Sequence, residues 1–340
     1  MTATSVTPVT LLTGFLGSGK TTLLNRLVAH PAAGDCAVIV NEFGPVAIDH
    51  ALVRTASENI VLLPSGCVCC QVAGDLVQAM RELYFKRAAG EVPDFRRAII
   101  ETTGLADPAP LARTLIELPL VAARYSLSGI VATVDGTHGL AQLDAHPEAV
   151  KQAAVADRLV VTKSDLATEG QLVALEERLA ALNPGALRIR SANGDADPAR
   201  LLDTGLYQGA GRLGSALSWL NAGAYRRVGD PPGARHDPRV RAFAWFAEAP
   251  VDWPAFEDSL ATLLELAGER ILRVKGLANC AGGEGPVAVH AVQHTLYPPA
   301  RLPQWPDADR RTRLVFIVRD LEESFVAHSL DSFVHVPAER

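Results

Sequence analysis

Three cysteines stand close together in the segment PSGCVCCQV, residues 64–72, although the whole chain has only five cysteines. Deprotonated thiols bind Zn²⁺ and other borderline metals well, so Cys67, Cys69 and Cys70 are candidate metal ligands. Three thiolates leave one tetrahedral position open, and Glu42 in VNEFG is the candidate to fill it. A redox pair of Cys67 with Cys70, or inert buried thiols, are the alternatives.

A phosphate-binding sequence precedes the thiol segment. Residues 14–21, GFLGSGKT, match G-x-x-x-x-G-K-[ST] between an apolar run and a helical pattern. In such a loop the backbone N–H groups hold phosphate, Lys20 reaches the β and γ oxygens, and Thr21 ligates Mg²⁺. The alternative is a glycine-rich turn that matches by chance. The predicted phosphate and Mg²⁺ contacts are Gly14, Gly17, Ser18, Gly19, Lys20, Thr21 and Thr22.

An acidic residue ends another apolar run. In RRAIIETTGLADP, residues 96–108, Glu101 follows the buried strand pattern, and Gly104 just beyond it is a further predicted nucleotide contact. P-loop enzymes use such a carboxylate to hold Mg²⁺ or to orient the attacking water. We therefore predict that Glu101 acts with Lys20 in catalysis, the alternative being a structural carboxylate at a strand end.

A guanine-reading element is predicted at Thr162, Lys163 and Asp165, in the sequence TKSD. A carboxylate at Asp165 can accept two hydrogen bonds from guanine, whereas adenine has no matching pair of donors. Ser-Asp before a helix is also an ordinary N-cap, which is the competing interpretation. The position after a buried strand favours nucleotide recognition.

These residues need a parallel sheet to bring them together. The first 220 residues alternate short β-branched runs with longer amphipathic stretches, which is typical of α/β proteins. We predict strands at 9–13, 37–40, 97–100, 129–134, 158–162 and 186–189. We predict helices at 21–30, 74–90, 108–118 and 169–183.

The composition changes near residues 221–238, where glycine, proline and charge collect without periodicity. Beyond this segment, runs of strands with two helices predict a smaller α+β domain. The fold class expected is thus α/β, a P-loop NTPase with a mostly parallel sheet, plus that domain. The predicted division is a GTPase domain at 1–222, a linker at 223–238 and a C-terminal domain at 239–340.

Charge and composition narrow the class of protein. The formal net charge is −6 and basic residues are scattered, so neither a nucleic-acid nor a membrane surface is expected. The N-terminus lacks a basic segment ahead of its apolar run, and we expect a cytoplasmic protein. Thiols stay reduced there, which favours metal or redox chemistry over disulfides. The sequence is compatible with a homo-oligomer.

Two histidines offer another candidate metal pair. His290 and His294 lie four positions apart on a predicted strand, which would place both on one face. Histidines with a structural role are the competing interpretation, and we favour it over a metal site.

The combined motifs resemble the CobW-type P-loop GTPases, which act as metallochaperones and include cobalamin-synthesis and nitrile hydratase activator proteins. The resemblance covers nearly the whole chain. The matching segments are GFLGSGKTT, VNEFG, GCVCC, ETTGLADP, TKSD and the C-terminal stretch 273–320.

The resemblance implies GTP hydrolysis coupled to binding of a divalent transition metal, Zn²⁺ or Co²⁺, and to its delivery to a client metalloprotein. Magnesium-dependent hydrolysis would use Lys20 and Glu101, and the cargo would bind the three clustered cysteines and Glu42. Pro45 departs from the family's frequent acidic residue, and no histidine-rich tract is present. A nucleotide-switched adaptor with a structural zinc, or a small-molecule kinase, are the competing functions.

Overall fold

The computed structural model describes residues 6–33, 35–40, 62–64, 72–202, 216, 220–229 and 239–334. The chain divides into two compact units. The first unit is Met1–Glu177 with Ala186–Gln208, and the second is Arg178–Gly185 with Gly209–Arg340.

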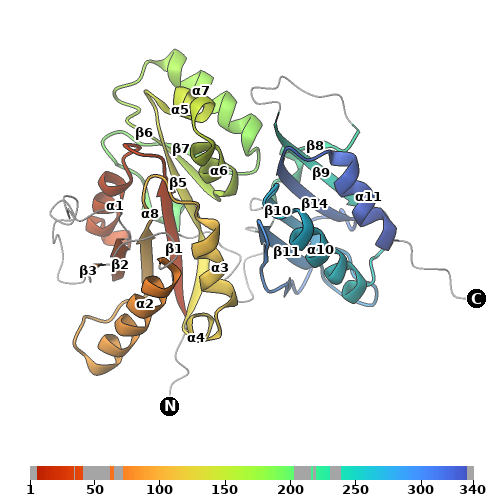
Figure 1. Ribbon diagram of the computed structural model, residues 1–340, viewed down its shortest axis with the longest axis horizontal. Helices are drawn as coiled ribbons and strands as arrows, with labels where there is room; N and C mark the ends of the chain where they lie inside the picture. Colours follow the sequence, from red (N-terminus) through yellow and green to blue (C-terminus); the bar gives the residue numbers. More distant parts are fainter. Residues whose placement is uncertain are drawn as a thin grey trace, which may run out of the picture. The chain divides into compact units, whose positions relative to one another are not determined.

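Among the described residues, seven strands of the first unit form one parallel sheet in the order β3-β2-β4-β1-β5-β6-β7 (Figure 1). The parallel α/β sheet expected from the sequence is therefore confirmed. Its strands are β1 (Thr7–Gly14), β2 (Cys36–Val40), β3 (Leu62–Pro64), β4 (Arg97–Glu101), β5 (Tyr125–Asp135), β6 (Arg158–Thr162) and β7 (Leu187–Arg190).

The sequence pattern predicts four of the helices that connect these strands, but it predicts neither β3 nor the helices α4, α5, α6 and α8. The described connecting helices are α1 (Lys20–Ala29), α2 (Val72–Ala89), α3 (Ala109–Glu117), α4 (Pro119–Ala122), α5 (Gly139–Ala145), α6 (Pro147–Val155), α7 (Glu169–Leu182) and α8 (Pro198–Leu202), with a 3-10 turn η1 at Pro31–Ala33.

Both faces of the parallel sheet are buried. Leu12 of β1 packs with Leu23 and Leu27 of α1 in one core cluster. Side chains alternate along a strand, so Leu11 and Ile100 point to the opposite face, where each is 0% exposed. Helices thus cover the sheet on both sides, and its carboxyl edge is left as the place for a ligand.

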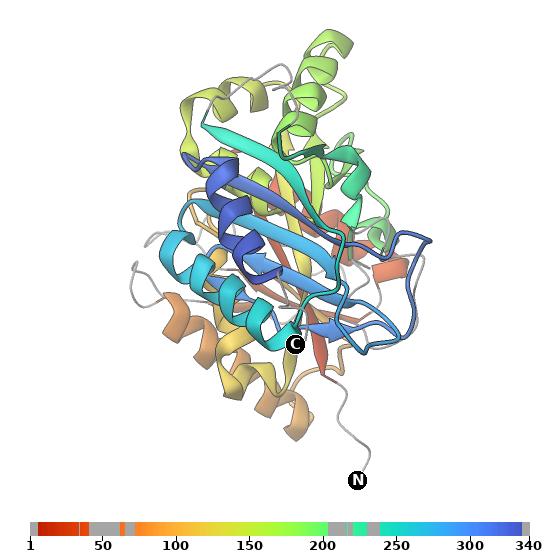
Figure 2. The same ribbon diagram turned by 90° about the vertical axis from the view of Figure 1, so that its right-hand side faces the viewer.

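The second unit is built on a mixed sheet in the order β12-β11-β10-β14-β9-β8, with β13 paired to β11. The helices α10 and α11 lie side by side over one face of this sheet (Figures 1 and 2). Strands with two helices match the expected smaller α+β domain. The elements are η2 (Ala222–Ala224), β8 (Arg226–Arg227), β9 (Val240–Ala247), α10 (Trp253–Ala267), β10 (Ile271–Ala278), β11 (Val287–Val292), β12 (Thr295–Leu296), β13 (Ala300–Arg301), β14 (Thr312–Arg319) and α11 (Glu323–Val334).

The segment predicted to link two domains, 223–238, is only partly described. Its residues Arg226 and Arg227 form β8 and pair with β9 of the second sheet. Residues 230–238 lie outside the described residues.

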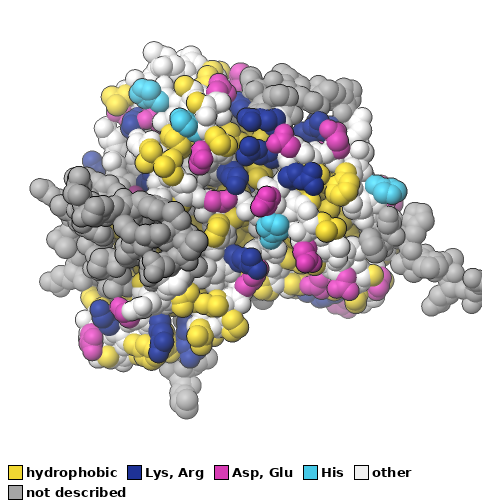
Figure 3. Space-filling model, in the orientation of Figure 1, with side chains coloured by type: hydrophobic (Ala, Val, Ile, Leu, Met, Phe, Trp, Pro, Cys, Tyr) yellow, Lys and Arg dark blue, Asp and Glu magenta, His cyan; other side chains and the backbone are white. Residues whose placement is uncertain are grey.

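The described surface matches the low net charge. Figure 3 shows Lys and Arg side chains lying next to Asp and Glu side chains on the described part of this face. Within the described residues, no helix is both long enough and apolar enough to span a bilayer.

Candidate nucleotide and metal site

The phosphate-binding sequence forms the loop between Gly14, where β1 ends, and Lys20, where α1 begins. Gly14, Gly17 and Gly19 have φ angles of 143°, 71° and 84°, which L side chains rarely adopt. A Cβ on Gly14 would also lie 2.2 Å from the hydroxyl oxygen of Thr133. Glycine therefore permits the tight turn that points the first N–H groups of α1 at an anion in the loop.

Lys20 lies against the backbone of this loop. Its Nζ donates hydrogen bonds to the carbonyl oxygens of Gly14 at 2.9 Å and Phe15 at 3.2 Å. Ser18 is buried, and its hydroxyl lies 2.6 Å from that of Thr133 on β5. The loop is thus braced by the sheet and carries a cation where phosphate would bind.

A carboxylate lies beside the first turn of α1. Glu101 ends β4 and is 4% exposed, and it pairs in register with Leu12 of β1. The hydroxyl of Thr21 donates a hydrogen bond to Glu101 Oε1 at 2.7 Å, while Thr22 is exposed on the same turn. Hydroxyl and carboxylate oxygens suit Mg²⁺, so this donor pair fits the ion expected with a nucleotide.

The segment that follows β4 touches the phosphate loop. A Cβ on Gly104 would lie 2.8 Å from both Cα and N of Leu16, so the two backbones meet there. Gln152 of α6 donates through Nε2 to the carbonyl oxygens of Gly104 at 3.2 Å and Ala106 at 3.0 Å. This geometry places the predicted residue Gly104 at the phosphate loop and adds Gln152, which the sequence analysis missed.

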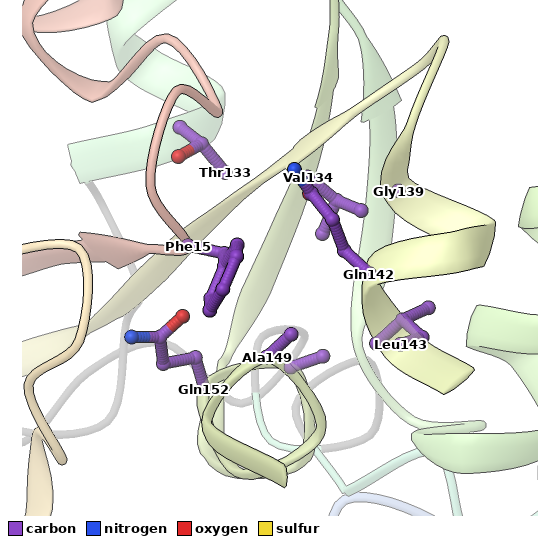
Figure 4. Close-up of a pocket in the computed structure, with 9 residues that line it drawn as sticks. Phe15, Thr133, Val134, Gly139, Gln142, Leu143, Ala149 and Gln152 are labelled. Atoms are coloured by element: carbon purple, nitrogen blue, oxygen red, sulfur yellow. The ribbon is translucent and has the colours of Figure 1, made fainter. Parts of the chain in front are cut away.

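A small cavity of about 10 Å³ lies between the phosphate loop and the helices α5 and α6. It is too small for a nucleotide and is near the lower limit for one water molecule. In Figure 4 the side-chain oxygen of Gln152 points toward Phe15. That Oε1 is buried and has no hydrogen-bond partner among the described residues. Phe15 also stacks on His146, the residue between α5 and α6, with ring centroids 4.5 Å apart.

The predicted guanine-reading element lies at the carboxyl end of β6. The Thr162 hydroxyl donates to the carbonyl oxygen of Ser18 at 2.7 Å, which ties this element to the phosphate loop. Lys163 has a φ of 52° and turns the chain sharply. Asp165 is exposed, and its Oδ1 accepts a hydrogen bond from the N–H of Asn193 at 3.1 Å. A carboxylate is therefore presented at this edge of the sheet.

Sequence reasoning missed a second acidic residue of this edge, Asp135. It ends β5, and its Oδ2 accepts a hydrogen bond from Lys163 Nζ at 2.6 Å. Burial alone would raise the pKa of Asp135, but hydrogen bonds from Lys163, Thr137 and His138 lower it to about 2. The signal was available, because an acid at the end of a buried strand is the same pattern that identifies Glu101.

Two cysteines are described, and neither suits a metal. Cys36 and Cys280 are both buried and free of disulfides. Burial raises the pKa of Cys36 to about 11 and also raises the pKa of Cys280. Both thiols stay protonated near neutral pH, so they are poor metal ligands.

The predicted transition-metal ligands lie outside the described residues: Glu42, Cys67, Cys69 and Cys70. Within the part of the chain that is described, no cluster of three or more His, Cys, Asp or Glu side chains could hold a metal ion.

The two candidate histidines do not share a strand face. His290 lies in β11 and stacks on Tyr297, with ring centroids 4.1 Å apart. β11 ends at Val292, and His294 follows in a turn where its Nδ1 lies 2.9 Å from the carbonyl oxygen of Leu264. The expected common face was wrong because the strand ends before His294, and both rings take structural positions.

Comparison with known proteins extends these observations. Residues 8–190 match the CobW/HypB/UreG nucleotide-binding domain, and residues 240–334 match the cobalamin synthesis protein CobW C-terminal domain. The zinc chaperone YjiA of Escherichia coli is 32% identical over 315 residues, which cover 93% of this chain and 95% of YjiA. The zinc chaperone CobW of Pseudomonas aeruginosa is 30% identical over 362 residues, covering 95% of this chain and 90% of that protein.

A solved structure gives the same assignment. The crystal structure of the Zn(II)-bound YjiA GTPase from E. coli superposes with a TM-score of 0.71 at 27% identity. The alignment covers 97% of this chain and 99% of that structure. Both family domains occur in order on one chain, together with the phosphate loop, Glu101 and the TKSD element at one sheet edge. The chain therefore belongs to the CobW family of P-loop GTPases.

Proposed function

We propose that this protein is a Mg²⁺-dependent GTPase that couples GTP binding and hydrolysis to the binding of Zn²⁺ or Co²⁺ and to its delivery to a client metalloprotein. Zinc is the first candidate because the two chaperones compared above are named for zinc. In this proposal, the described part of the chain binds and hydrolyses GTP, and the cysteine segment binds the transition metal.

One observation carries the proposal. The ends of β2 and β3, which lead into the Glu42 segment and the cysteine segment, are neighbours in the sheet. β2 and β3 run parallel, and Val40 pairs in register with Pro64. On its other side Val40 pairs with Glu101 of β4. Adjacent strands are about 4.8 Å apart, so the segments entering the Glu42 loop and the thiol loop start side by side, next to the Mg²⁺ carboxylate.

This register supports Glu42 and the thiols as ligands of one metal ion. Residue 42 follows Val40 by two positions, and Cys67 follows Pro64 by three. Each residue spans at most about 3.5 Å of chain, so both groups start within a short reach of one edge. A carboxylate with three thiolates makes a four-ligand set for Zn²⁺ or Co²⁺.

Each nucleotide-binding residue has a definite task in this proposal. The phosphate loop and Lys20 bind the β- and γ-phosphates, and Asp165 accepts hydrogen bonds from guanine. Thr21 and Glu101 would hold Mg²⁺, and the bound ion would neutralise part of the charge that develops on the phosphate oxygens. In this proposal the segment beyond Glu101, held by Gln152, orients the attacking water.

In this proposal, nucleotide binding and metal binding affect each other. A Glu42 loop that is ordered by the γ-phosphate completes the metal site, and hydrolysis loosens it so that a client with its own ligands takes the ion. If GTP raises metal affinity by some factor, metal raises GTP affinity by the same factor, with a typical coupling of about 5- to 150-fold.

The test is a titration of Zn²⁺ and of Co²⁺ into apoprotein, the GDP complex and the complex with a non-hydrolysable GTP analogue. Affinity should be highest with the analogue, and Glu42→Ala and Cys69→Ser should remove that gain. Cys280→Ser is the matched control, since a hydroxyl can replace the thiol that donates to the Ala278 carbonyl. Equal affinity in both nucleotide states would instead indicate a switched adaptor with a structural zinc.

A further inference from the structure

Asp135 is a buried carboxylate that receives four hydrogen bonds at the nucleotide edge. Its side chain is 3% exposed. Lys163 donates from Nζ at 2.6 Å, and Thr137 donates from its backbone N at 2.8 Å and its hydroxyl at 2.6 Å. The backbone N of His138 donates at 3.1 Å. The carboxylate is thus fixed in place and ionised near neutral pH.

Gly136, the residue after Asp135, contacts Thr162, where the guanine-reading element begins. The backbone N of Gly136 donates to the carbonyl oxygen of Thr162 at 2.8 Å. A Cβ on Gly136 would lie 2.7 Å from that same oxygen. Asp135 itself pairs with Thr162 in the β5–β6 register. The end of β5 therefore supports Thr162 and Lys163 through backbone and side chain together.

Lys163 needs this support because its backbone is in the left-handed region. Its φ is 52°, a conformation that is unfavourable for a residue with a Cβ. Its carbonyl oxygen accepts a hydrogen bond from the N–H of Leu166 at 3.0 Å, which closes the turn that carries Asp165. The conformation of Lys163 thus sets where the Asp165 carboxylate lies.

We propose that Asp135 is a positioning residue for guanine recognition, which holds Lys163 and its left-handed turn so that Asp165 meets the base. This inference rests on the proposed GTP-binding function and extends its recognition site to a residue that does not touch the nucleotide. A role limited to capping the turn at Thr137 and His138 is the rival explanation, and it makes different predictions for base selectivity.

The test compares wild type with Asp135→Asn, which keeps the size of the side chain and an acceptor oxygen but removes the ion pair with Lys163. Dissociation constants are measured for GDP, for IDP, which lacks the 2-amino group, and for ADP. We expect GDP affinity to fall by at least about 10-fold and IDP affinity to fall less. Asp94→Asn is the matched control, because the Asp94 side chain is 80% exposed and also forms an ion pair, with Arg87.

Lys163→Met and the double variant of Asp135→Asn with Lys163→Met test whether the effect of Asp135 on GDP affinity depends on its ion pair with Lys163. If Asp135 acts through Lys163, the double variant loses no more GDP selectivity than Lys163→Met alone. Lys163→Met also tests the inference by itself if Asp135→Asn does not fold, as judged by circular dichroism; a wild-type ratio of GDP to IDP affinity in it would overturn the proposal.

The possible outcomes distinguish a failure of this inference from a failure of the proposed GTP-binding function. An unchanged ratio of GDP to IDP affinity in folded Asp135→Asn, or additive effects in the double variant, would refute the positioning role. Wild-type protein that binds ADP as tightly as GDP would refute guanine recognition as a whole.

Discussion

The hydroxyl of Thr21 donates a hydrogen bond to the carboxylate of Glu101 at 2.7 Å, across 80 positions of the chain. The contact joins the first turn of α1 to the end of β4. It brings a hydroxyl oxygen and a carboxyl oxygen to the same point of the sheet edge, beside the phosphate loop. Both are ligands that Mg²⁺ prefers, so the pair offers a direct test of the predicted ion site.

Glu101→Gln should separate charge from shape at this site. The amide keeps an acceptor for Thr21 but loses the negative charge, so the gain in GTP affinity on adding Mg²⁺ should shrink. Hydrolysis should slow by about 100-fold, as expected when a few kcal/mol of charge stabilisation is lost. Phosphate release measured against Mg²⁺ concentration checks this, with Glu117→Gln on the exposed face of α3 as the control. Superimposable Mg²⁺ curves would show that Glu101 does not hold the ion.

Lys20→Ala should abolish measurable GTP hydrolysis while the fold persists. The substitution removes the cation beside the loop but leaves the glycine turns and the buried Ser18 anchor in place. Phosphate release and thermal unfolding are measured together, and Lys86→Ala in the last turn of α2 is the control. Wild-type turnover in Lys20→Ala would contradict the assignment of the phosphate loop.

Asp165→Asn should change the preferred base. Guanine has two donors for a carboxylate, whereas xanthine has a carbonyl in place of the amino group and suits an amide donor. The ratio of GTP to XTP affinity should therefore fall by about 100-fold. Competition binding measures it, and Asp195→Asn, which alters an exposed carboxylate nearby, is the control. Equal wild-type affinity for ATP and GTP would contradict guanine recognition.

Strongly patterned elements could be predicted from sequence because burial and backbone preference agree there. RLVVT at 158–162, for example, forms β6 with the expected bounds. α5 and α6 were missed because the break at His146 and Pro147 divides a short alanine-rich stretch. β3 spans only three residues, too few to show a period.

Contacts between distant residues explain what sequence could not predict in the site. The phosphate loop and Glu101 follow from local motifs, since each ends a buried strand. The pair of Asp135 with Lys163 depends on β5 and β6 being neighbours and on a left-handed φ at Lys163. Neither the strand order nor that φ can be predicted from a short stretch of sequence, because tertiary packing determines both.

Asp135 should also make stability depend on pH in a defined window. Its pKa is about 2 in the folded protein, below the ordinary value of 3.8, so its contribution is fully present above pH 3.8. As the pH falls toward 2 the carboxylate is protonated and that contribution is lost. The difference in free energy of unfolding between wild type and Asp135→Asn should be of the order of 2 kcal/mol at pH 7 and shrink below about pH 4. Urea unfolding at pH 7, 5, 4 and 3 measures it, and a difference that stays constant would contradict the ionised pair.

Gln152→Leu should uncouple the segment after β4 from the phosphate loop. The substitution leaves the carbonyl oxygens of Gly104 and Ala106 without the amide that now binds both. Unfolding free energy should fall by about 1–3 kcal/mol, the cost of leaving buried acceptors unpaired.

The same change should slow hydrolysis more than it weakens binding. Gly104 meets Leu16 of the phosphate loop, so a shift of this segment alters where a water molecule can attack the γ-phosphate. Small misplacements cost up to about 100-fold in rate, and we expect kcat for GTP to fall by about 10-fold with an unchanged Kd for GDP. Gln142→Leu is the matched control, because Gln142 lines the same cavity from α5. Equal losses in the two variants would assign the effect to the cavity wall, whereas a loss confined to Gln152→Leu would show that its two hydrogen bonds hold the catalytic segment in place.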